Sequence, residues 1–304
     1  MMDTVWLDTH VHVSEPRDRG NAIDELMAGL TDVLDAEAAD LRLVISPDAH
    51  WNRIVRDEVD GVERAAAFIH DVVERMPKKL YGSCPVNPNH LDSSLRAMER
   101  CFEQWGFVML GEMLGYMMGF DLANDAGERL ARQASVYGVP VQVHISTSNA
   151  AQQGHTSGMG ELHDLLALAE RVPEANYILA HFVGTQITDP TPVSAYLDVI
   201  EERYGTWPRN FWAEIRDFNS PGLEDALNRI PLERLICGTD WTTRGGPPYA
   251  PYGVVFDVFT SDAPTPYAPC IDSLAAFLTG HGLTSAQVKA IAHTNAAQLM
   301  PLSR

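Results

Sequence analysis

Apolar and polar positions follow two alternating spacings along the whole chain. Short apolar or β-branched runs are typical of strands, and longer segments with apolar residues three and four apart are typical of helices. The predicted strands are Thr4–Val11, Leu41–Ser46, Lys79–Val86, Phe107–Met113, Val139–Ser146, Asn176–Gly184, Arg209–Asp217 and Glu233–Trp241. The predicted helices are Asn21–Asp40, Asp60–Met76, Leu91–Trp105, Asn124–Gly138, Met159–Val172, Val193–Gly205 and Ser220–Ile230, with two more after a Gly-, Pro- and Tyr-rich loop at Thr242–Thr265.

This alternation amounts to about eight β/α units, which predicts a (β/α)8 TIM barrel. We expect one metal-dependent domain over residues 1–304. Several predicted strands are apolar throughout, as expected for a parallel sheet that is covered on both faces. A doubly wound open sheet is the alternative, but it normally carries a Gly-rich phosphate loop, and the chain has neither GxGxxG nor the P-loop pattern.

The composition narrows the class of protein. The chain has 304 residues, of which 45% are hydrophobic and 21% charged, as in folded proteins of ordinary composition. A net charge of -19 disfavours binding to nucleic acid or to anionic lipid. We recognise no signal peptide and no apolar run of about 18 residues, and the four cysteines form no CxxC pair. These features fit a cytoplasmic enzyme that acts on a small molecule, and they admit a homodimer.

Polar residues stand at the ends of the predicted strands, where a barrel carries its active site. They are His10, His12, Glu112, His144, His181, Glu214, Arg216, Asp217 and Asp240. Most of them follow apolar runs, where polar residues are least expected by chance. A structural role is the alternative for any single histidine, but a set at four strand ends favours a common site.

His10 and His12 are two residues apart, so both side chains point to the same face of a strand. We expect them to bind one metal ion inside the barrel, with a third nitrogen from His144 and a carboxylate from Asp240. Neutral imidazole suits Zn²⁺, Mn²⁺, Fe²⁺ and Co²⁺, and zinc is our first choice. Such an ion lowers the pKa of water and polarises a substrate carbonyl.

Four short motifs carry a resemblance to a known family. They are DTHVH at Asp8–His12, VQVHIS around His144, LAHF around His181 and GTDW around Asp240, followed by IAHTNAAQLM near the C-terminus. In this order the chain resembles the amidohydrolase superfamily, and within it the branch of aminocarboxymuconate semialdehyde decarboxylase and related metal-dependent hydrolases. The resemblance implies that His10, His12, His144 and Asp240 bind the metal. It implies that His181 orients water, stabilises charge on the substrate or, as in some relatives, binds the metal itself.

Glu112 is the main ambiguity of this resemblance. Many relatives bridge two metal ions with a carboxylated lysine or a glutamate at the end of the fourth strand. The three lysines, Lys78, Lys79 and Lys289, all lie elsewhere, which disfavours a lysine bridge. A second metal ion bridged by Glu112 is one alternative, and a hydrogen bond from Glu112 to a ligand or to the substrate is the other.

These residues are compatible with three functions. The first is hydrolysis of an amide, ester, lactone or related C–N or C–O bond, with Asp240 shuttling the proton. The second is non-oxidative decarboxylation of an unsaturated or aromatic acid, and the third is a barrel that keeps its ligands only as a binding module. We expect Arg216 or Arg244 to bind a substrate carboxylate, and Tyr116 and Trp241 to shape an apolar pocket.

Overall fold

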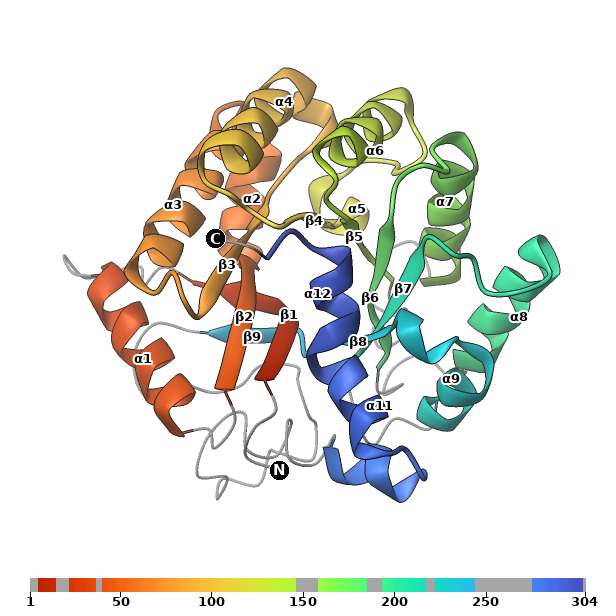
Figure 1. Ribbon diagram of the computed structural model, residues 1–304. Coiled ribbons are helices and arrows are strands. Elements are labelled where there is room, and N and C mark those ends of the chain that lie inside the picture. Colours follow the sequence, from red (N-terminus) through yellow and green to blue (C-terminus); the bar gives the residue numbers. More distant parts are fainter. Residues whose placement is uncertain are drawn as a thin grey trace.

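The computed structural model describes residues 5–14, 22–36, 40–145, 158–184, 193–216, 222–243 and 275–302. Within these ranges strands and helices alternate along the chain (Figure 1). The predicted (β/α)8 barrel is confirmed.

The strands form one parallel sheet in the order β8-β7-β6-β5-β4-β3-β2-β1-β9. Their bounds are β1 Val5–Val13, β2 Asp40–Pro47, β3 Leu80–Cys84, β4 Met109–Met113, β5 Val141–His144, β6 Tyr177–Val183, β7 Phe211–Ile215, β8 Leu235–Cys237 and β9 Trp241–Thr243. Neighbours in sequence are neighbours in space, as in a barrel wound by right-handed β/α units.

The ring closes through an interrupted last strand. β8 pairs with β7, whereas β9, which starts four residues after β8 ends, pairs with β1. The interruption contains Gly238, Thr239 and Asp240. Asp240 therefore lies between the segment that pairs with β7 and the segment that pairs with β1.

Helices cover the outside of the sheet (Figure 1). Their bounds are α1 Ala22–Ala36, α2 Ala49–Asp57, α3 Gly61–Arg75, α4 Leu91–Glu99, α5 Gly115–Met118, α6 Asp125–Tyr137, α7 Gly158–Arg171, α8 Val193–Tyr204, α9 Leu223–Arg229, α11 Ser285–Lys289 and α12 Asn295–Leu299. A π-helical stretch, Ala290–Thr294, joins α11 to α12. Among the described residues, no helix is long and apolar enough to cross a membrane.

A layer of apolar side chains fills one end of the barrel. It includes Leu7, Val44, Tyr81, Met109, Ile178, Trp212 and Ile236, one from each of seven strands. Ala296 and Leu299 of α12 and the following Met300 pack against this layer, and Figure 1 shows α12 lying across the middle of the ring of strands. The end of the barrel remote from the candidate site is therefore closed by apolar packing.

The sequence pattern did not predict α2. Its N-cap residue, Asp48, accepts hydrogen bonds from the backbone N–H groups of His50 and Trp51. The predicted C-terminal end of the first helix was also wrong, because Asp40 is the first residue of β2. The first difference is a short helix stabilised by its N-cap, and the second lies at an element boundary, which apolar spacing defines poorly.

The last helix is anchored by Asn295. Its side-chain amide donates hydrogen bonds to the backbone carbonyls of Leu232 and Leu235, both at 2.8 Å. We expect Asn295→Ala to lower the free energy of unfolding by about 1–3 kcal/mol, because two interior carbonyls lose their donor. Urea unfolding measures this, and Gln298→Ala, at an exposed position of the same helix, should leave the stability near wild type.

Candidate metal centre

The candidate site lies where the regular pairing of the strands breaks down. The register shifts around His10 in β1, around Glu112 in β4 and around His181 in β6. Irregularities of this kind redirect side chains that a regular strand would point elsewhere. They bring side chains from separate strands to one point inside the barrel.

Two of these residues have an unusual backbone conformation. Among the described residues, His181 and Asp240 are the non-glycine residues with positive φ, at 40° and 57°. This region is sparsely populated by side-chain-bearing residues and costs conformational energy. The surrounding hydrogen bonds must therefore hold both residues in place.

A first group of donor atoms comes from the two ends of the ring. The Nε2 atoms of His10 and His12 lie 3.1 Å apart. Asp240 Oδ1 lies 3.6 Å from the first nitrogen and 3.3 Å from the second. Glu112 Oε2 lies 3.4 Å from each of the same two nitrogens. The two carboxylate oxygens therefore both face this pair of nitrogens across one small space.

The other ring nitrogens of this histidine pair are engaged outside the space. His10 Nδ1 lies 2.8 Å from Glu214 Oε2, and His12 Nδ1 lies 2.8 Å from the carbonyl oxygen of Pro47. Both acceptors favour a proton on Nδ1. Nε2 is consequently the atom that each ring directs at this space, and it is the atom available to a metal ion.

A second group lies on the other side of Glu112. Its Oε1 atom is 2.9 Å from His144 Nδ1 and 3.3 Å from His181 Nε2. These two nitrogens are themselves 2.9 Å apart. Glu112, 5% exposed, therefore presents one oxygen to each group.

The charges around Glu112 shift the pKa values of the site in opposite directions. Burial raises the pKa of Glu112, but the charges of His10 and His144 outweigh it and hold the pKa well below its usual range. Burial lowers the pKa of His12, yet hydrogen bonds to Asp240 and Glu112 raise it to about 9. Burial also lowers the pKa of His10, but the charges of Glu214 and Glu112 outweigh it and raise this pKa well above its usual value. In the metal-free protein the site thus pairs carboxylates with imidazolium rings.

The pKa values of Asp240 and His181 are both lowered, which leaves an ionised carboxylate and a neutral ring. Burial raises the pKa of Asp240, but its hydrogen bond with His12 and the charges of His10 and Arg216 hold it below its usual value. The pKa of His181 is lowered by burial and by the charge of His144, so the ring is neutral. Arg216 Nε lies 3.6 Å from Asp240 Oδ2 and the residue is 3% exposed.

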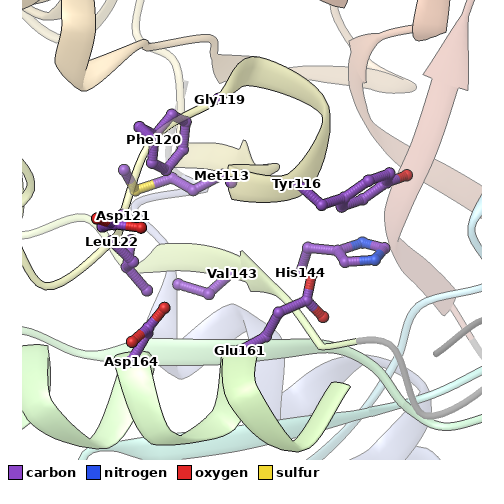
Figure 2. A pocket seen from close by; sticks show the side chains of 11 residues that line it. Met113, Tyr116, Gly119, Phe120, Asp121, Leu122, Val143, His144, Glu161 and Asp164 are labelled. Carbon is purple, nitrogen blue, oxygen red and sulfur yellow. The ribbon is translucent and has the colours of Figure 1, made fainter. Parts of the chain in front are cut away.

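A cavity of about 260 Å³ adjoins the second group. It lies between α5 and α7, and Figure 2 shows Tyr116 beside His144 at one end of it. Their ring centroids are 4.7 Å apart. The side chains of Glu161 and Asp164 reach it from α7. The cavity provides space for a small molecule next to the candidate centre.

The structure brings together most of the residues predicted from the sequence. His10, His12 and Asp240 form one group, and His144 lies with His181 and Glu112 in the other. Arg216 lies beside Asp240, and Tyr116 beside His144. The side chain of Trp241 and all of Arg244 and Asp217 lie outside the described residues.

Two buried carboxylates contact the site without a role assigned from the sequence: Asp8 was noted only within the DTHVH motif, and Glu214 only among the polar residues at the strand ends. Asp8 accepts hydrogen bonds from the backbone N–H groups of His10 and Thr239, and burial raises its pKa to about 7. Glu214 contacts His10 directly. In the sequence, each is an acidic residue inside an apolar strand, and that was the available signal.

The fold and the site define a class: a (β/α)8 barrel with histidine and carboxylate side chains gathered inside it as a candidate metal centre. The sequence model of the amidohydrolase family (Amidohydro_2) matches residues 7–302. The chain belongs to this family and is an enzyme of the amidohydrolase superfamily. None of the curated proteins searched matches it.

Solved structures support the fold across the whole chain. 5-Carboxyvanillate decarboxylase from Sphingomonas paucimobilis is 13% identical, with a TM-score of 0.66 and 100% of both chains covered. 4-Oxalomesaconate hydratase from Rhodopseudomonas palustris is 12% identical, with a TM-score of 0.67, 98% of this chain and 96% of the other being covered. A dihydroxybenzoic acid decarboxylase from Polaromonas sp. JS666, solved with bound manganese and 2-nitroresorcinol, is 16% identical, with a TM-score of 0.62, 100% of this chain and 98% of the other being covered.

The raised pKa of His12 predicts how the stability of the metal-free protein depends on pH. The folded-state pKa is about 9 and the unfolded value 6.5. The stabilisation is therefore complete below pH 6.5 and is lost as the pH rises through 9. We expect the free energy of unfolding to fall by on the order of 2–3 kcal/mol over this range.

Urea unfolding in chelator at a series of pH values measures this slope. His12→Gln should flatten it, and His163→Gln, at an exposed position of α7, should not. A slope that His12→Gln leaves unchanged would assign the pH dependence to other groups.

Proposed function

We propose that this protein is a metal-dependent hydrolase that cleaves an amide, ester, lactone or related C–N or C–O bond of a small molecule. One observation carries the proposal: the Glu112 carboxylate faces two groups of ligand atoms, with one oxygen toward each. Two ions held close together suit the activation of water for attack on a carbonyl or similar centre.

The donor atoms fit first-row divalent ions. Zinc binds nitrogen and oxygen at about 2.0–2.2 Å, so four ligand atoms in a tetrahedron lie about 3.3–3.6 Å apart. The distances from the His10 and His12 nitrogens to each other and to Asp240 Oδ1 and Glu112 Oε2, 3.1 to 3.6 Å, are close to this spacing. Imidazole and carboxylate suit zinc and also manganese, the ion bound by the decarboxylase from Polaromonas.

The site residues would bind the ions in two sets. His10, His12, Glu112 and Asp240 would hold one ion, and Glu112, His144 and His181 a second. Bound ions would supply Lewis acidity and lower the pKa of water.

Asp240 is the proton acceptor in this proposal. Its carboxylate is ionised, and its side chain is 21% exposed, compared with 2% for Glu112. It is thus the more accessible carboxylate of the first group, and a proton from water or substrate can reach it. The neutral His181 ring, on the neighbouring group, is suited to orient water or to stabilise charge on the substrate.

The substrate-binding residues follow from position and charge. Arg216 can pair with a substrate carboxylate while it remains beside Asp240, and Tyr116 would form the wall of the adjoining cavity. Trp241 and Arg244 stay predictions for the same role. A cytoplasmic location and a homodimer also stay predictions.

A metal-dependent decarboxylase of an unsaturated or aromatic acid is the second candidate. Its support is the similarity of nearly the whole fold to that of two decarboxylases of aromatic acids. The same ligand set and the same Arg216 would serve this reaction. A buried arginine beside the ions would hold the carboxylate that is lost.

Metal content tests the arrangement of the ions. We expect about two divalent ions per chain after loading with zinc or manganese, and about one after His144→Ala or after His12→Ala, because each variant leaves the other group intact. Elemental analysis measures the content. His90→Ala, in the short 3₁₀ helix Pro88–His90 and in neither group, is the control. A single ion that His144→Ala abolishes would instead support one ion shared by His10, His12, His144 and Asp240.

The type of reaction is tested with panels of amides, esters, lactones and unsaturated or aromatic acids. We expect metal-loaded protein to turn over one of the first three classes, with one oxygen atom from ¹⁸O-labelled water appearing in the product. Asp240→Asn should lower kcat by at least about 100-fold through loss of the proton acceptor. Release of CO₂ without incorporation of labelled oxygen would contradict hydrolysis and establish the second candidate.

A further inference from the structure

Glu214 is a fully buried acid inside the barrel that the proposed reaction does not use. It stands on β7, and its side chain has no exposed surface. Its Oε1 atom accepts hydrogen bonds from Thr9 Oγ1 at 2.9 Å and from Gln142 Nε2 at 2.7 Å. Its Oε2 atom lies 2.8 Å from His10 Nδ1 and accepts a hydrogen bond from the backbone N–H of His181 at 2.9 Å.

These four contacts match what a carboxylate offers. An ionised carboxylate has only acceptor sites, about four of them, and a donor lies at each, although the Thr9 hydroxyl proton is shared with the carbonyl oxygen of Cys237. The donors come from β1, β5 and β6, so one side chain links three strands to β7. An unpaired buried charge would be costly, and this carboxylate is fully paired.

Oε2 contacts both groups of the candidate centre. The rings of His10 and His181 are stacked, with centroids 5.6 Å apart and an angle of 23° between the planes. Glu214 holds the Nδ1 side of the first ring and the backbone of the second residue, which has positive φ. The Nε2 atoms of both rings lie within 3.4 Å of Glu112.

We infer that Glu214 is a positioning residue that orients ligands of both ion sites, an inference that rests on the proposed metal-dependent function. It keeps the ring proton of His10 on Nδ1, which leaves Nε2 as the ligand atom. It also holds the end of β6 in the conformation that directs His181 at Glu112. A single carboxylate thereby aligns the two halves of the centre.

The neighbouring strand leaves space for this carboxylate. A Cβ atom added to Gly238 would lie 2.4 Å from Glu214 Cδ, which is far inside van der Waals contact. The glycine of the GTDW motif therefore gives Glu214 the room to reach His10. A side chain at this position would displace the carboxylate without removing it.

The test is the affinity for zinc, measured by competition with a chromophoric chelator on folded protein. Glu214→Met removes the acceptors at similar volume, and we expect it to weaken zinc binding about 10- to 100-fold. Gln142→Met is the matched control, because it removes a donor to Oε1 and leaves the Oε2 contacts in place. Its affinity should stay close to that of the wild type.

A second variant keeps the inference testable where Glu214→Met fails to fold. Gly238→Ala retains the carboxylate but moves it, and it should weaken zinc binding in the same direction. Nitrogen-15 NMR of the zinc-loaded wild type should show the His10 proton on Nδ1, and this signal should broaden or vanish in either variant.

The outcomes separate the inference from the proposed function. Wild-type zinc affinity in the folded variants would overturn the positioning role and leave the metal-dependent function standing. Failure of the wild-type protein to bind zinc or manganese would overturn the proposed function itself. Equal weakening by Gln142→Met would show general loosening of the interior and would also overturn the specific role of Oε2.

Discussion

The structure of the centre depends on the burial of charge around Glu112. Four imidazole rings and three carboxylates, those of Glu112, Glu214 and Asp240, meet inside one barrel. Each charge alone would be expensive to bury, so every one needs a partner of opposite sign or a hydrogen bond. In the metal-free chain the protonated rings provide that balance, and divalent ions would replace those protons.

This arrangement explains the irregular geometry of the strands. A regular strand spaces its inward side chains evenly and could not direct residues of β1, β4 and β6 at one point. The register shifts at His10, Glu112 and His181, and the break before β9, bring the side chains together. These irregularities cost conformational energy, and the apolar core at the other end of the barrel, which includes residues of α12, offsets that cost.

Glu214 serves both the pairing of buried charges and the alignment of the irregular strands. Its carboxylate joins β7 to β1, β5 and β6 by hydrogen bonds, and it contacts a ring of the centre directly. The same group therefore contributes to closing the barrel and to orienting donor atoms. A site built on rigid strands and supported from behind suits chemistry that needs fixed distances between ligand atoms.

The sequence by itself determined the barrel and the residues at its strand ends, because both follow from patterns of neighbouring residues along the chain. Apolar runs alternate with helical spacing, and His10 and His12 share a face through the two-residue period of a strand. The sequence could not determine how the donors divide. That His144 lies with His181 rather than with the first pair, and that Glu112 faces both groups, depends on register shifts between strands distant in sequence. The role of Glu214 was hidden for the same reason, since its partners converge on it only when the barrel closes.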